Sequence, residues 1–189
     1  MEDRILIVSA SEKSADALAY ILKRYGWNNI DFASSGVESK RIMLRTMYDL
    51  IIINSPLKDG RGNELAVDFV RNTSSTVVLI AKSDIAEVVA SAVEGEGVIV
   101  VSKPLQQRDF LGAVRLSLAF RERMKKLIDT NLKHEKKYEE LRLVSRAKCV
   151  LIEKKEMTEQ EAHRYIEKQA MDRRESKSIV ASGIIKKYM

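Results

Sequence analysis

The sequence predicts an α/β domain with a five-stranded parallel sheet, followed by a long helix and a small all-helical unit. Three observations lead to this fold class. Short, β-branched apolar runs alternate with amphipathic segments over residues 1–105. A proline-free stretch over residues 106–143 is much longer than an ordinary globular helix. Residues 144–189 are basic and contain three short helical patterns. These three parts are the predicted domains.

The strands of the first part are predicted by five apolar runs with little polar interruption, as expected for a sheet covered on both faces. They span residues 4–9 (RILIVS), 30–33, 50–54 (LIIIN), 76–81 (TVVLIA) and 98–102 (VIVVS). Helices are predicted between them, over residues 12–25, 35–48, 63–71 and 85–93. The run at residues 30–33 is the shortest, which is typical of an edge strand.

Two segments give this part a family likeness: DLIIINSPLKDGRGNELA at 49–66 and VVSKPL at 100–105. With the alternation of strands and helices, they resemble the receiver domain of bacterial response regulators. The resemblance covers slightly more than half the chain and implies a flavodoxin-like fold with strand order 2-1-3-4-5.

The same resemblance implies a phosphorylation site, but its acidic residues are missing. In receivers, two acids after the first strand and an aspartate ending the third strand hold Mg²⁺, and that aspartate accepts the phosphoryl group. Here the acid pair falls at Ser9 and Ala10, and the acceptor position is Asn54. An amide lacks the anionic oxygen nucleophile. The sequence therefore predicts a pseudo-receiver that is not phosphorylated at Asn54 and needs no metal or other cofactor.

The remaining receiver positions are also altered. The hydroxyl position that ends the fourth strand is Ile80 or Ala81, and only the lysine that ends the fifth strand, Lys103, is kept. Asp59, in the next loop, is acidic, but KDG favours a turn former over a substitute acceptor. Control by a regulatory protein or ligand on this domain, or a constitutive state, both stay open.

The long helix carries a seam with steps of four and three residues, the repeat of a coiled coil. Its members are Phe120, Met124, Leu127, Asn131, His134, Tyr138 and Leu141. An asparagine at one a position favours a two-stranded pairing, so we expect a homodimer. The alternative is one long helix lying on its own domain, because two seam residues are polar.

The tail is expected to fold as three helices, over residues 142–155, 159–172 and 177–187. Thr158 and Glu161 predict a capping box that opens the second helix. The inward residues are expected to be Val144, Ala147, Val150 and Leu151, then Ala162, Tyr165, Ile166, Gln169 and Ala170, then Ile179, Val180, Gly183 and Ile184.

The tail resembles the ANTAR domain, the AmiR/NasR transcription antiterminator module, over about 45 residues. The matching residues are Ala147-Lys148, Leu151, Met157-Thr158-Glu159, Ala162 and Ala170-Met171. Cys149 replaces the usual glycine, and His163 stands where an aromatic is common. The resemblance implies an RNA-binding antiterminator that stabilises hairpins competing with an intrinsic terminator.

Charge gives independent support for a nucleic-acid partner. Residues 1–105 have a net charge of −2 and residues 106–189 of +8. The expected RNA contacts are Lys148, Arg164, Lys168, Arg173, Arg174 and Lys177. For Tyr165 a core position is favoured over stacking on a base, Cys149 is expected to be a small packing residue, and His163 a surface residue.

Other function classes have weaker support. A DNA-binding helix-turn-helix in the last two helices and a protein-docking module remain as alternatives. No nucleophile, base and oxyanion donor form a catalytic set, so an enzyme is not expected. One cysteine and no apolar run of 18 residues favour a cytoplasmic protein without a membrane span.

Overall fold

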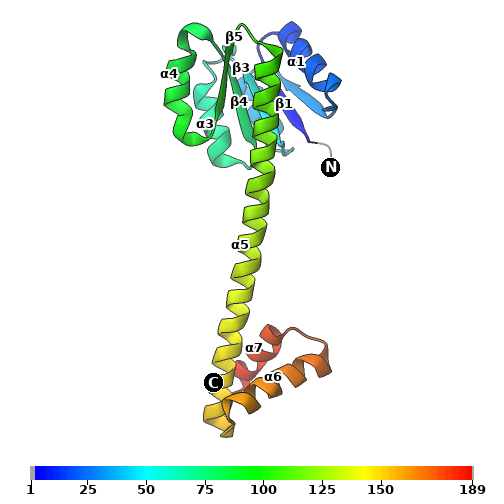
Figure 1. The fold of residues 1–189 in the computed structure, drawn as a ribbon, viewed down its shortest axis with the longest axis vertical. Coiled ribbons are helices and arrows are strands. Elements are labelled where there is room, and N and C mark those ends of the chain that lie inside the picture. The colour runs from blue at the N-terminus through cyan, green and yellow to red at the C-terminus, as the bar shows by residue number, and fades with distance from the viewer. Residues whose placement is uncertain (1–2, 189) are drawn as a thin grey trace. The chain divides into compact units, whose positions relative to one another are not determined.

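The computed structural model describes residues 3–188, apart from the side chain of residue 94, and contains two compact units. The first unit extends to residue 125 and the second begins at residue 126. In the first unit, strands and helices alternate as predicted (Figure 1). Their order is β1 (Ile5–Ser9), α1 (Glu12–Arg24), β2 (Ile30–Ala33), α2 (Gly36–Met43), β3 (Leu50–Asn54), α3 (Asn63–Asn72), β4 (Thr76–Lys82), α4 (Ser83–Val93), a 3-10 turn (Glu94–Glu96), β5 (Ile99–Lys103) and the start of α5 (Gln107–Lys155).

The sheet is parallel and has the order β2-β1-β3-β4-β5, which confirms the receiver-like topology. Alternate residues of each central strand face opposite sides, because side chains of a strand alternate. Ile52 and Ile80 pack with α1 and α5 on one face, whereas Ile53 and Leu79 pack with α2, α3 and α4 on the other. Burial on both faces explains why these strands read as continuous apolar runs.

Helix α2 ends at Met43, and the predicted extension to Tyr48 was wrong. Tyr48 is buried, and its hydroxyl donates to the Asp31 carboxylate at 2.7 Å. The chain leaves the helix early because this contact on β2 requires Tyr48 to reach the sheet. Burial, followed by the hydrogen bond to Asp31, raises the pKa of Tyr48 to about 12.

The start of α5 is held against the sheet by an acidic side chain at the head of β3. The Asp49 carboxylate accepts the backbone N–H of Arg4 at 2.6 Å and pairs with the Arg121 guanidinium at 2.5 Å. Phe110 and Val114 of α5 are fully buried in the same core. Side chains of α5 from residue 122 to 139 are exposed.

Helix α5 is one continuous helix of 49 residues. The long helix and the first helical segment of the tail, which the sequence treats as two pieces, are therefore joined. The expected boundary between residues 143 and 144 falls inside this helix and stays a prediction.

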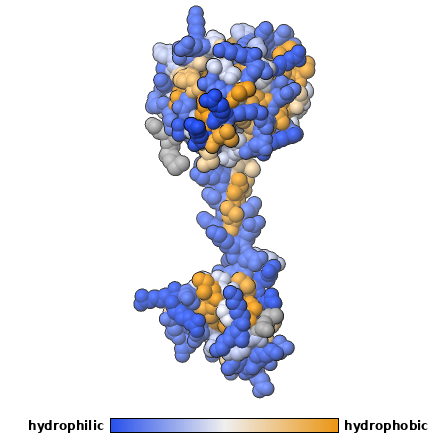
Figure 2. All heavy atoms as spheres, turned by 180° about the vertical axis from the view of Figure 1, so that it is seen from behind, coloured by the Kyte–Doolittle hydropathy of each residue, from blue (hydrophilic) through white to orange (hydrophobic). Residues whose placement is uncertain are grey.

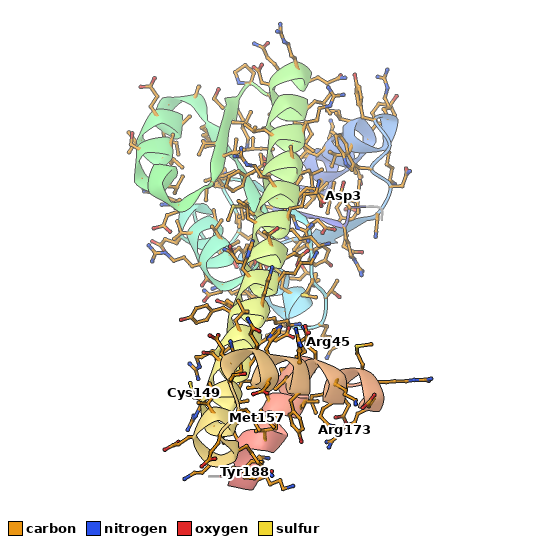
Figure 3. All side chains as sticks on the ribbon, turned by 60° about the horizontal axis from the view of Figure 1, so that its bottom comes forward. Asp3, Arg45, Cys149, Met157, Arg173 and Tyr188 are labelled. Atoms are coloured by element: carbon orange, nitrogen blue, oxygen red, sulfur yellow. The ribbon has the colours of Figure 1, made fainter. Side chains whose placement is uncertain are left out.

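The second unit contains the end of α5 together with α6 (Glu159–Arg173) and α7 (Lys177–Tyr188) (Figure 3). The capping box is confirmed: Glu161 N–H donates to the Thr158 hydroxyl, and Thr158 N–H donates to the Glu161 carboxylate at 2.8 Å. The small core contains Val144, Ala147, Val150, Leu151, Ala162, Ile166, Ala170, Val180, Ala181 and Ile184.

Four expected inward positions of this unit were wrong or only partly right. Ile179 and Gly183 are exposed, and Ala181 is buried in their place. Tyr165 is exposed and Gln169 only half-buried, because the buried stripe of α6 takes steps of four residues.

No helix among residues 3–188 combines the length and the apolar character that crossing a bilayer requires.

Candidate functional sites

The carboxyl edge of the sheet is where receiver chemistry would take place, and here it is uncharged on β1 and β3. Ser9 and Asn54 are paired in register, and the Asn54 amide donates to the Ser9 hydroxyl at 3.1 Å. The Ser9 hydroxyl in turn donates to the carbonyl of Ser11 at 3.0 Å. Ala10 adds only a methyl group. An amide and a hydroxyl thus occupy the place of three carboxylates.

The neighbouring strand supplies no hydroxyl to this edge. Ile80 is the register partner of Asn54, and both Ile80 and Ala81 are about 1% exposed. Both residues that the sequence offers for the hydroxyl position are therefore apolar and buried. Among residues 3–188, excluding the side chain of residue 94, no three His, Cys, Asp or Glu side chains gather as a metal site.

Lys103 ends β5 beside this neutral edge. Its ammonium donates to the carbonyl of Ser55 at 2.6 Å. Burial lowers the pKa of Lys103, and the positive charge of Lys82 lowers it further. The structure therefore places a lysine at the expected position but without the acidic residues that accompany it in receivers.

Asp59 has a structural role that depends on a distant segment. It lies in the turn between Leu57 and Gly60, as expected for KDG. Its carboxylate accepts the N–H groups of Gly36 and Val37, each at 2.9 Å. Asp59 thereby caps the start of α2 across 23 residues of sequence. These hydrogen bonds, from Gly36 first and then Val37, hold the pKa of Asp59 below its usual value.

The six expected RNA contacts fall into two groups in the second unit. Two of the six are used in ion pairs that tie helices together. Lys148 of α5 pairs with Glu159 of α6 at 2.8 Å, and Lys177 of α7 pairs with Glu167 of α6 at 2.5 Å. Each lysine lowers the pKa of its glutamate.

The other four cations are exposed. Arg164 and Lys168 lie on the side of α6 opposite its buried stripe, because residues four apart share a helix face. Arg173 is the last residue of α6 (Figure 3). Arg174 follows as a left-handed C-cap with a φ of 55°.

Of the uncharged side chains of α6, Met171 was missed as a candidate, and Tyr165, for which a core position was favoured over stacking on a base, is exposed. Met171 continues the outward line of Arg164 and Lys168 and is 78% exposed. Tyr165 is 38% exposed, so its ring is accessible to a ligand. The signal was available in the sequence, because the Ala162, Ile166 and Ala170 spacing places Tyr165 on the flank of the stripe. Cys149 is exposed as well, so the expected packing role was wrong.

Comparisons with known proteins follow this division into two units. Residues 133–185 match the ANTAR domain family. The transcriptional regulatory protein PdtaR of Mycobacterium tuberculosis is 24% identical over 182 residues, which cover 96% of this chain and 89% of that protein. Over its whole length the chain is therefore similar to a transcriptional regulatory protein, and its C-terminal part is similar to the ANTAR domain.

Solved structures identify the fold of the first unit. A receiver domain protein of Methanospirillum hungatei matches with a TM-score of 0.59 and 21% identity, over 66% of this chain and 99% of that chain. A structure described as an adenylate cyclase from Rhodopirellula baltica matches with a TM-score of 0.64 and 16% identity, over 70% of this chain and 99% of that chain. At these identities the likeness shows the fold alone.

Between the receiver fold and the ANTAR match, α5 exposes an apolar stripe. Figure 2 shows apolar side chains gathered along this helix. The expected seam residues are all exposed in the single chain, including Phe120 at 54% and Leu127 at 50%. Leu116, Ile128 and Leu132 are exposed too and were missed by the seam pattern. With Phe120 and Met124 they form a line with steps of four residues, which widens the stripe.

We expect Asp59→Ala to lower the free energy of unfolding of the receiver-like unit by about 1 kcal/mol at pH 7, the usual cost of a lost helix cap. The pKa of Asp59 is depressed in the folded state, so its stabilisation is present above about pH 4 and is lost as the pH falls through the folded pKa. Urea unfolding of both proteins should therefore show a difference that shrinks below about pH 4.

Asp16→Ala is the matched control, because Asp16 is an exposed carboxylate of α1. An equal loss of stability in the two variants at pH 7 would mean that Asp59 does not cap α2.

Proposed function

We propose that this chain is a transcription antitermination regulator whose ANTAR domain binds an RNA hairpin. The observation that carries the proposal is the exposure of Arg164 and Lys168 on the outer face of α6 and of Arg173 and Arg174 at its end, together with the accessible ring of Tyr165, which follows Arg164 in the sequence. Cationic side chains bind phosphates, and an exposed aromatic ring stacks on an unpaired base of a loop. The relative PdtaR, a transcriptional regulatory protein, supports the same role.

The ion pairs of the second unit support a division of labour among its cations. Lys148 and Lys177 already have carboxylate partners, so RNA binding through them requires these pairs to be exchanged. Among the residues that the structure describes, Arg164 and Lys168 form no ion pair that RNA would have to displace. We therefore assign the main phosphate contacts to the outward face of α6 and to its end.

The proposal predicts that the double variant Arg164→Ala/Lys168→Ala binds a leader-transcript hairpin more weakly. Each lost phosphate contact should also reduce the salt slope of log K by about 0.7–0.9. The measurement is fluorescence anisotropy of a labelled hairpin over a salt series, with excess duplex DNA as competitor.

Lys13→Ala/Lys23→Ala removes the same charge from the receiver-like unit and serves as the matched control. Tyr165→Leu should weaken binding with no change in salt slope, because stacking releases no counterions. Unchanged affinity in the α6 double variant would reject this face. Full displacement of the hairpin by duplex DNA would favour a DNA-binding regulator instead.

We also propose that the regulator works without phosphorylation at residue 54. A hard divalent cation needs several oxygen ligands, and the edge offers the Ser9 hydroxyl and the Asn54 amide in place of carboxylates. The neutral amide is also a poor phosphoryl acceptor. Phosphorylation at this position would therefore lack both the metal ion and the nucleophile that it requires.

Incubation with acetyl phosphate and Mg²⁺ should leave the mass of the intact protein unchanged. A receiver domain with a complete acidic site is the positive control for the phosphoryl donor. A gain of one phosphoryl group that disappears in Asn54→Ala would contradict the proposal.

Two copies of the chain are proposed to pair along α5. A stripe of half-exposed leucine, isoleucine, methionine and phenylalanine side chains is costly in water and is typical of a helix-pairing surface. Pairing would bring two ANTAR domains together, so that two hairpin loops are bound at once with higher apparent affinity.

Leu127→Lys should weaken the dimer by more than about tenfold, because a charge enters the seam at both copies. Sedimentation equilibrium measures the dissociation constant. Asp129→Lys introduces the same side chain on the opposite side of the helix and should leave that constant nearly unchanged. A wild-type protein that stays monomeric at high concentration would exclude the paired helix.

A further inference from the structure

A hollow of about 430 Å³ opens beside the altered carboxyl edge of the receiver-like sheet. Leu18 and Ile21 of α1, Ile80 of β4 and Leu105 after β5 form its apolar walls. Asn54 and Lys103 are polar groups in the same lining. Its size is within the usual range of small-molecule sites, which combine apolar walls with a few placed polar groups.

The ammonium of Lys103 has hydrogen-bonding capacity left for a ligand. An ammonium has three N–H donors, and one donates to the carbonyl of Ser55. No ion pair joins Lys103 to a carboxylate among the side chains that the structure describes. Lys82 is its register neighbour on β4, so two positive charges adjoin at this edge.

Asn54 is suited to the same ligand. One N–H of its amide donates to Ser9, and an amide nitrogen carries two. Among residues 3–188, the second N–H of this amide donates to no other group, so it is available to a ligand. An aspartate here would repel an anion, whereas the amide can donate to one. Carboxylates at this edge would attract a cation. With neutral groups in their place, the positive charge of Lys103 makes the edge attractive to an anion.

We propose that this hollow binds a small monocarboxylate with an apolar body. The carboxylate accepts hydrogen bonds from Lys103 and the Asn54 amide, and the apolar body lies against Leu18, Ile21, Ile80 and Leu105. Burial of the ligand's own apolar surface against these walls favours such a ligand over inorganic phosphate, which has the charge but no apolar surface to bury. Binding an anion would also relieve the unfavourable burial of the Lys103 charge, the main cause of its lowered pKa.

This site is distinct from the proposed RNA interface, so each is tested without the other. The test titrates the full-length protein with octanoate, phenylacetate and indole-3-acetate in a calorimeter. At least one should bind with a Kd of about 1 mM or tighter. Its amide counterpart should bind about tenfold more weakly, the effect of losing a hydrogen bond to a charged group. Inorganic phosphate tests charge without apolar surface and should bind more weakly than the carboxylate.

Asn54→Asp is the decisive variant, since it keeps the shape and adds a negative charge. It should weaken carboxylate binding by at least about tenfold, as should Lys103→Gln. Lys23→Gln removes a charge from α1 outside the hollow and should have no effect. Circular dichroism checks that each variant is folded. If Lys103→Gln does not fold, the result with Asn54→Asp alone decides whether the inference holds.

Four results would overturn the inference. They are no binding by any of the three carboxylates, equal binding of acid and amide, phosphate binding as tight as the carboxylate, and unchanged binding in folded Asn54→Asp.

Discussion

The hydrogen bond between the Asn54 amide and the Ser9 hydroxyl sets the chemistry of the receiver-like unit. A neutral pair at this edge leaves neither a ligand set for a hard cation nor an anionic nucleophile. It also leaves Lys103 with a backbone carbonyl as its partner in place of a carboxylate. The fold tolerates this change because its stability comes from the buried strand residues on both faces, such as Ile52 and Ile53, and not from the edge.

The basic end of the chain shows how one set of charges serves two purposes. Ion pairs from Lys148 and Lys177 to α6 join the three helices around their small core. The cations on the outer face of α6 contribute nothing to that core, so they are available to a polyanion. Net positive charge alone would not distinguish these groups, whereas the positions of Glu159 and Glu167 do.

Local signals in the sequence predicted the strands, the capping box at Thr158 and the altered edge, because each depends on a short run or on a motif position. The end of α2 was missed because Tyr48 contacts Asp31, and the cap from Asp59 was missed because its partners are 22 and 23 residues away. The exposure of Tyr165 was missed although the spacing of Ala162, Ile166 and Ala170 places it on the flank of the buried stripe, because the expected stripe was too wide. Long-range contacts therefore account for most of what could not be predicted.

The most direct test of the account is to crosslink the protein to RNA in living cells and to sequence what is bound. We predict reads that concentrate on hairpin loops upstream of intrinsic terminators, and that are lost when Arg164 and Lys168 are both replaced by alanine. Recovery of duplex DNA without RNA, or of transcripts with no shared hairpin, would contradict the claim that the C-terminal helices bind folded RNA.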